Sequence, residues 1–128
     1  MNSLTLDQIL QLHALVLLKD GGSDGVRDIG RLEAAVASQY QAVFDEELYK
    51  TIHEKAAAMI RGIIGDHPFS DGNKRTAMLA GLTLLELNGL VFEAVAGELE
   101  DFAVQVAVEH LGVEEIAKWL DEHSKKAN

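Results

Sequence analysis

Two helical patterns meet at a short turn rich in polar side chains, and this turn constrains the chain more than any other feature. Its residues are His67-Pro68-Phe69-Ser70-Asp71-Gly72-Asn73-Lys74-Arg75. A periodicity typical of an amphipathic helix precedes it over about residues 45–65, and a more apolar one follows over about residues 73–88. A helix N-terminus presents unbonded N–H groups and the positive end of its dipole, so the turn predicts an anion site.

Cationic side chains stand where the second helix is predicted to begin. Lys74 and Arg75 would oppose the helix dipole there, and a bound polyphosphate would compensate both. Gly72 and Asn73 bring backbone N–H groups close to phosphate oxygens, and the Asn73 side chain can add a donor. The Arg75 fork matches phosphate, while Lys74 supplies a compact charge. The alternative is that both cations are simply solvated.

The same turn contains a candidate base and a candidate metal ligand. His67 can accept a proton at physiological pH, although a single histidine is more commonly a helix cap or a packed core residue. Asp71 is a hard oxygen ligand suited to Mg²⁺, but it could also be a turn residue or an ion-pair partner of Lys74 and Arg75. Structural roles are expected for the other histidines, namely His13, His53, His110 and His123.

The turn resembles the signature of the Fic/Doc superfamily, whose Fic branch has His-Pro-Phe-x-Asp/Glu-Gly-Asn-Gly-Arg-x-x-Arg. Lys74 stands in place of the second glycine and Met78 in place of the second arginine. Both departures resemble the death-on-curing (Doc) branch, whose loop ends Asn-Lys-Arg. Residues 25–35 are also similar to that branch, and the resemblance covers roughly residues 4–122.

The resemblance implies a role for each residue of the turn. His67 is the catalytic base that deprotonates a target hydroxyl, Arg75 is also catalytic, and Asp71 holds Mg²⁺ against the nucleotide phosphates. Phosphate binding is assigned to Gly72, Asn73, Lys74 and Arg75. A loop containing Arg27 and Asp28 is a possible docking site for the target protein, although these two residues could equally form a local ion pair and a helix cap.

Fic-branch enzymes transfer AMP, whereas Doc-type proteins bind ATP in the reverse orientation and transfer its γ-phosphate. Because Lys74 fills the phosphate channel and Met78 removes a clamp, we expect γ-phosphate transfer to a Ser/Thr hydroxyl of a host protein. The resemblance points to elongation factor Tu as the target and to arrest of translation and growth. AMP transfer is the alternative activity. A catalytically idle nucleotide-binding module and an all-α interaction protein are two further alternatives.

Regulation by a partner is also implied. Fic-type enzymes are commonly inhibited by a Ser/Thr-x-x-x-Glu-Gly/Asn helix, and the chain has no such pattern. We therefore expect a separate small antitoxin protein with a tail that folds on binding. It would bind either the acidic segment between Glu93 and Glu122, which has nine carboxylates and one cation, or a hydrophobic groove between helices.

Composition excludes several other classes of protein. The formal charge of −10 argues against direct binding of nucleic acid, and the absence of cysteine excludes disulfides and thiolate metal sites. Neither a basic, apolar leader nor an apolar run of membrane-spanning length is present. We expect a single cytoplasmic domain over residues 1–128 that does not enter a membrane.

The periodicity predicts an all-α bundle of about six helices, with the apolar helix after the turn at its centre. Thr5 and Gln8 form a capping box for a first helix ending near Leu18, and Asp45 is expected to cap the long third helix. Val91–Ala96 could be extended, but no second alternating run exists to pair with it, so a sheet is not expected. The other predicted helices begin at Asp28 or Gly30, at Glu98 and at Val113.

Overall fold

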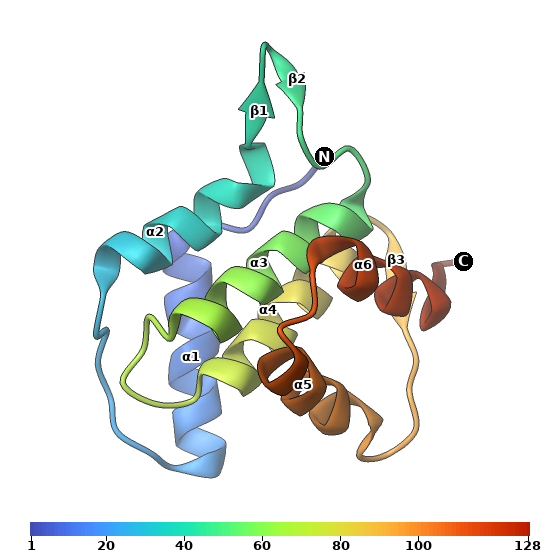
Figure 1. Cartoon of the computed structure of the whole chain (residues 1–128). Helices are drawn as coiled ribbons and strands as arrows, with labels where there is room; N and C mark the ends of the chain where they lie inside the picture. Colours follow the sequence, from blue (N-terminus) through green and yellow to red (C-terminus); the bar gives the residue numbers. More distant parts are fainter.

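The computed structural model describes residues 1–128 and confirms the all-α architecture with six helices (Figure 1). None of the helices is both long and apolar enough to cross a membrane. The helices are α1 (Leu6–Asp20), α2 (Ile29–Ala37), α3 (Ile52–Asp66), α4 (Asn73–Leu87), α5 (Glu98–Glu109) and α6 (Val113–Glu122). Short elements connect them: a 3₁₀ turn η1 (Ser38–Tyr40) and the strands β1 (Ala42–Val43), β2 (Glu46–Glu47), β3 (Leu90–Phe92) and β4 (Ser124–Lys126).

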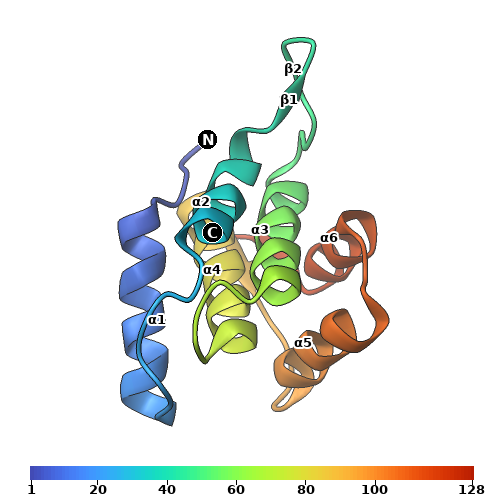
Figure 2. The same cartoon turned by 60° about the vertical axis from the view of Figure 1, so that its left-hand side comes forward.

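Helices α3 and α4 form the centre of the bundle, as the sequence predicts for α4. Helix α1 flanks them on one side, and α5 and α6 lie on the other (Figures 1 and 2). A Cβ atom at Gly81 would lie 2.4 Å from Cδ1 of Ile60, so the missing side chain allows α3 and α4 to approach closely. Fully burying an isoleucine or leucine contributes about 1.5–3 kcal/mol. This packing therefore fixes the positions in space of the C-terminal end of α3 and the N-terminal end of α4.

Local capping signals explain most helix boundaries. The Thr5–Gln8 capping box is present at the start of α1, and the Asp28 side chain accepts the Arg31 N–H at the start of α2. The prediction that Asp45 caps the third helix is wrong. Helix α3 begins instead at Ile52, because Thr51 and Glu54 form a capping box there.

Residues 42–47 form a small antiparallel hairpin, β1–β2, in place of the predicted start of the third helix. Asp45 lies at its turn with a positive φ of 65°. The buried Lys55 side chain holds the base of the hairpin, with Nζ 3.0 Å from the Gln39 carbonyl oxygen and 2.9 Å from Oε1 of Glu47. The hairpin projects from the first turn of α3, at the end of that helix opposite His67 (Figure 2).

The expectation that no sheet forms near residues 91–96 is also wrong. Strand β3 pairs antiparallel with β4, with Val91 opposite Lys125. The partner strand Ser124–Lys126 is polar and follows directly after α6, so its sequence shows no alternation of apolar residues. This small sheet closes the C-terminal end of the chain onto α4.

An aromatic cluster and an ion pair join the start of α5 to the end of α6. The Trp119 ring stacks on Phe102 at 4.0 Å and on His123 at 4.1 Å. His123 Nε2 lies 2.9 Å from Oε2 of Glu98, and its Nδ1 lies 2.7 Å from the Trp119 carbonyl oxygen. Burial disfavours the charged imidazole, but the Trp119 carbonyl and the Glu98 carboxylate outweigh burial and raise the pKa of His123. Hydrogen bonding to His123 lowers the pKa of Glu98.

These opposite pKa shifts predict a pH window for the stability of this contact. The contribution of His123 is fully present below its usual value of 6.5 and is lost as pH rises through the elevated pKa. The contribution of Glu98 is present above 4.5 and is lost as pH falls through the lowered pKa. We expect Glu98→Gln to lower the melting temperature more at pH 5.5 than at pH 8.5, as measured by circular dichroism. An equal loss at both values would contradict the charge pairing.

Candidate functional site

The predicted catalytic histidine ends α3 in a strained backbone conformation. His67 is the C-terminal capping residue, with φ 47° and ψ 58°, and its N–H donates to the Ile63 carbonyl. Arg27 binds this helix end, because its Nε and Nη2 donate to the His67 carbonyl at 2.9 and 2.6 Å. Nη2 also donates to the Asp66 carbonyl at 2.9 Å. A guanidinium at a helix C-terminus both satisfies the last carbonyls and complements the dipole.

The segment before α2 lies against the turn 67–72 as a short extended pairing. Both Arg27 and Asp28 donate their backbone N–H to the Pro68 carbonyl, at 2.7 and 3.0 Å. The Ser70 N–H donates to the Gly25 carbonyl at 3.1 Å, and Val26 forms a β-bridge with Phe69. The Arg27 side chain binds the C-terminal end of α3, and the Asp28 side chain caps the N-terminal end of α2. Their proposed role in target docking stays a prediction.

Asn73 closes the turn from its other end. Its Oδ1 accepts the Phe69 N–H at 3.0 Å, and its Nδ2 donates to the Phe69 carbonyl at 3.0 Å. The sequence predicts that this side chain can add a donor to phosphate, and in the structure its observed hydrogen bonds lie within the loop. One N–H of the amide remains for a ligand, since Nδ2 carries two.

The start of α4 has no side-chain cap, unlike the starts of α1, α2 and α3. Its capping residue is Gly72, in the left-handed region with φ 77°. The first backbone bond of the helix runs from the Thr76 N–H to the Gly72 carbonyl. The N–H groups of residues 73–75 therefore have no partner within the helix, which is the arrangement that binds anions.

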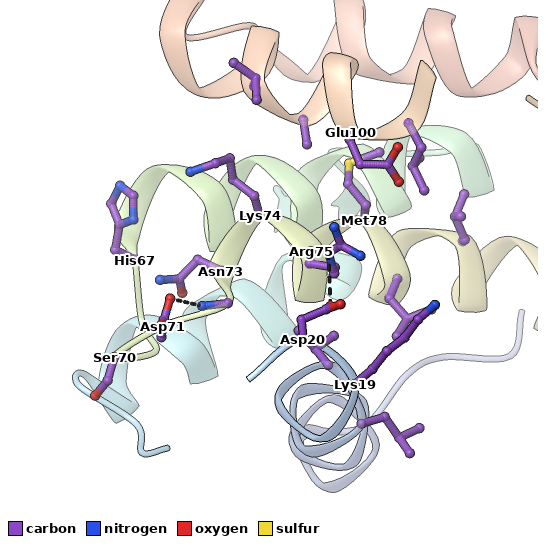
Figure 3. A pocket seen from close by; sticks show the side chains of 18 residues that line it. Lys19, Asp20, His67, Ser70, Asp71, Asn73, Lys74, Arg75, Met78 and Glu100 are labelled. Carbon is purple, nitrogen blue, oxygen red and sulfur yellow. Dashed lines mark hydrogen bonds and ion pairs between the residues drawn. The ribbon is translucent and has the colours of Figure 1, made fainter. Parts of the chain in front are cut away.

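A pocket of about 780 Å³ opens in front of this helix start (Figure 3). The turn 67–75, helix α4 and the facing sides of α1 and α5 enclose it. Its polar lining consists of Lys19, Asp20, His67, Ser70, Asp71, Asn73, Lys74, Arg75 and Glu100. Its apolar lining consists of Leu15, Val16, Met78, Leu79, Leu82, Leu99, Ala103 and Val104. His67 lies at the α3 end of the pocket, and Lys74 and Arg75 lie along it (Figure 3).

The two cations at the start of α4 differ in their surroundings. Arg75 pairs through Nε with Oδ2 of Asp20, the last residue of α1, at 3.2 Å. This contact uses one edge of the guanidinium and leaves both terminal nitrogens for a ligand. Lys74 has no ion-pair partner. The sequence predicts that an anion compensates the charge of both cations at the start of α4. Asp20 partly compensates the charge of Arg75, whereas no side chain compensates that of Lys74.

Asp71 is tied to the backbone around it. Its Oδ1 accepts the Gly72 N–H at 2.9 Å, and its Oδ2 accepts the Ser23 N–H at 3.3 Å. The carboxylate lies so close to Gly22 that a Cβ atom there would be 2.7 Å from Oδ2, and Gly22 also has φ 117°. A glycine is therefore required at this point of the loop after α1.

The donor set fits Mg²⁺ held jointly with a nucleotide. No group of three or more histidines or carboxylates is arranged to hold a metal ion by itself. Mg²⁺ usually takes one or two carboxylates, several waters and substrate phosphates, so a single pocket carboxylate is enough for it. Each oxygen of Asp71 accepts one backbone hydrogen bond and retains a further lone pair. Asp71 is the residue that would hold the ion.

The structure adds pocket residues that sequence reasoning missed. Lys19 and Asp20 come from α1 and Glu100 from α5, and both helices are distant from the turn in sequence. No local pattern marks these residues, because their placement depends on how the helices pack around α4. His13, for which the sequence predicts a structural role, lies directly under the turn, with Nε2 2.9 Å from the Asp71 carbonyl oxygen.

Comparison with known proteins agrees with this geometry. A sequence profile described as "Fic/DOC family" matches residues 3–85. "Toxin Doc" from Mycolicibacterium smegmatis is 37% identical over 102 residues, covering 78% of each chain. "Protein kinase doc" from Escherichia phage P1 is 31% identical over 121 residues, covering 94% of each chain. The chain belongs to the Fic/Doc family, and its similarity to these two proteins places it near the Doc branch.

The contacts of Arg27 predict a specific loss of stability. Arg27→Gln removes the guanidinium from the Asp66 and His67 carbonyls and should lower the free energy of unfolding by about 1–2 kcal/mol, the lower range for charged hydrogen bonds because the site is exposed. Arg61→Gln, an exposed arginine of α3 without such a contact, is the matched control. Urea unfolding measures both variants. Equal losses would mean that Arg27 does not stabilise the end of α3.

Proposed function

We propose that this protein is a toxin-type phosphotransferase that moves the γ-phosphate of ATP onto a Ser/Thr hydroxyl of a host protein. One observation supports this most strongly. His67 lines the same pocket as the uncapped start of α4, with its free N–H groups and the cations Lys74 and Arg75. A base beside a phosphate cradle is the combination that phosphoryl transfer to a hydroxyl needs. The relative named as a protein kinase also covers 94% of this chain.

The proposed step is an in-line displacement at the γ-phosphorus. The hydroxyl oxygen of the target attacks the γ-phosphorus while an unprotonated ring nitrogen of His67 accepts its proton. The bond between the γ-phosphorus and the bridging oxygen breaks, and ADP leaves with the electron pair. The N–H groups at the start of α4 and the free nitrogens of Arg75 bind the phosphate oxygens and stabilise the developing charge. Asp71 would hold Mg²⁺, which when bound would supply positive charge that offsets the charge of the phosphates.

Two residues favour γ-phosphate transfer over AMP transfer. Lys74 brings a long cationic side chain to the pocket where the Fic branch has a glycine. Met78, which is 2% exposed and lines the pocket one turn further along α4, supplies no charge where that branch has an arginine. Two of the three pocket cations, Lys74 and Arg75, are therefore at the turn, which suits binding of the terminal phosphate next to His67.

We take elongation factor Tu as the proposed target, with arrest of translation and growth as the result. This choice rests on the likeness to the Doc branch and not on a feature of the pocket. Both ATP and this factor are found in the cytoplasm, so the proposal locates the protein there.

The activity is tested with ATP labelled at either the γ or the α position, with Mg²⁺ and elongation factor Tu. We expect label from the γ position alone to reach the target. His67→Ala should reduce the rate by about 10²–10⁴-fold, the usual contribution of base catalysis. His53→Ala, which removes an imidazole bonded to Ser124 at the far end of α3, is the control.

Each other outcome assigns a different function. Transfer of the α label alone means AMP transfer. Binding of ATP without any transfer, unchanged by His67→Ala, means an idle nucleotide-binding module. Absence of any thermal stabilisation by ATP and Mg²⁺ excludes a nucleotide site altogether, because a ligand that binds the folded state must stabilise it.

We further propose that a separate small antitoxin protein inhibits this one. The pocket continues from the phosphate cradle into an apolar stretch between α1 and α5, where Leu15 and Val104 are 57% and 49% exposed. An amphipathic tail bound there would reach the nucleotide site directly. This groove is favoured over the acidic segment between Glu93 and Glu122, because Glu100 is the one carboxylate of that segment that lines the pocket.

Growth measurements test the toxin and antitoxin proposals together. Expression of the protein alone should arrest growth, and His67→Ala should abolish the arrest. Co-expression of a neighbouring small reading frame should restore growth, while the same frame with an early stop codon should not. Harmless expression of the unaltered protein at high level would exclude a toxin, and arrest that no neighbouring frame relieves would contradict the antitoxin.

A further inference from the structure

His13 lies beneath the turn and packs against it. It comes from the middle of α1, is 4% exposed and does not line the pocket. Its ring is parallel to that of Phe69, with the centroids 3.8 Å apart and the planes inclined by 9°. Phe69 is itself 1% exposed. The two rings form a buried layer on which the turn rests.

A hydrogen bond connects this layer to the backbone at the candidate metal ligand. Nε2 of His13 lies 2.9 Å from the Asp71 carbonyl oxygen. A carbonyl can only accept, so Nε2 carries the hydrogen in this contact. Sequence spacing could not reveal the contact, since 58 residues separate the two partners.

The bonded carbonyl belongs to the peptide group that joins Asp71 to Gly72. The N–H of the same peptide donates to Oδ1 of Asp71 at 2.9 Å. A Cβ atom at Gly72 would lie 3.8 Å from Cδ2 of His13, so the backbone at Gly72 passes close to the ring. Fixing this peptide plane therefore fixes two features at once, the direction of the Asp71 carboxylate and the left-handed capping residue of α4.

We propose that His13 is a positioning residue for the nucleotide site. Through the Asp71 carbonyl it holds the Asp71–Gly72 peptide in the orientation that directs the carboxylate and the free N–H groups of α4 toward the phosphates. This inference rests on the proposed function, because it assigns His13 to the same site. His13 does not touch the nucleotide and acts through the turn alone.

Two substitutions of similar shape isolate the hydrogen bond. His13→Gln and His13→Met both lose the aromatic stack, but glutamine places an amide N–H near the position of Nε2 and methionine has no donor. The comparison between them removes the contribution of packing. His53→Gln, which alters a histidine bonded elsewhere, controls for general destabilisation.

Two measurements on the intact protein decide the inference. The first is the Kd of ATP with Mg²⁺ by calorimetry, where His13→Met should bind roughly tenfold more weakly than His13→Gln, the factor expected for one lost buried hydrogen bond. The second is amide exchange by NMR without nucleotide, where the Phe69, Ser70 and Gly72 amides should exchange faster in His13→Met than in His13→Gln.

The two measurements also separate this inference from the proposed function. If the unaltered protein binds no ATP, the proposed function fails, and amide exchange still tests whether His13 orders the turn. If ATP binds and both variants show the same Kd and the same exchange rates, His13 only fills space and the inference is wrong. A general loss of stability would change the Kd and the exchange rates of both variants equally, so it would not produce a difference between them.

Discussion

The close packing of α3 against α4 is the constraint on which the site depends. These two helices contribute 11 of the 23 residues in the buried core, and Gly81 lets Ile60 lie where a Cβ atom would otherwise be. Because α3 ends and α4 begins at the same end of the bundle, only residues 67–72 connect them. A connection that short has few conformations once both helix ends are fixed. The position of His67 relative to the start of α4 therefore follows from core packing, without any contact between the candidate catalytic groups themselves.

Contacts from three other segments of the chain hold the turn. Arg27 and Gly25 bind it from the segment before α2, Asn73 closes it from α4, and His13 supports it from α1. By contrast, no side chain caps the N–H groups at the start of α4. A rigid loop with free donors can bind charge without reorganising, which is the property that electrostatic catalysis depends on.

Local signals explain what could be predicted from the sequence. Helical periodicity and the Thr5–Gln8 box gave α1, and the apolar pattern after the turn gave a central α4. Errors arose where a partner strand or an anchoring side chain lies outside the local pattern. The polar strand β4 carries no alternation that would mark it as the partner of β3, and the β1–β2 hairpin depends on the buried Lys55. The polar residues of the turn can be singled out from the sequence because they are contiguous, whereas Asp20 and Glu100 reach the pocket only through helix packing.

Charge in and around the pocket bears on the form of the nucleotide that can bind. The chain carries a formal charge of −10, so its overall field opposes an approaching triphosphate. The three cationic residues of the pocket, Lys19, Lys74 and Arg75, are balanced in number by the three acidic ones, Asp20, Asp71 and Glu100. Asp20 already neutralises part of Arg75. Under the proposed function, the remaining attraction comes from Lys74, the α4 dipole and a cation on Asp71. This balance favours a nucleotide–magnesium complex over the bare nucleotide, because the metal ion offsets both the phosphates and the Asp71 carboxylate.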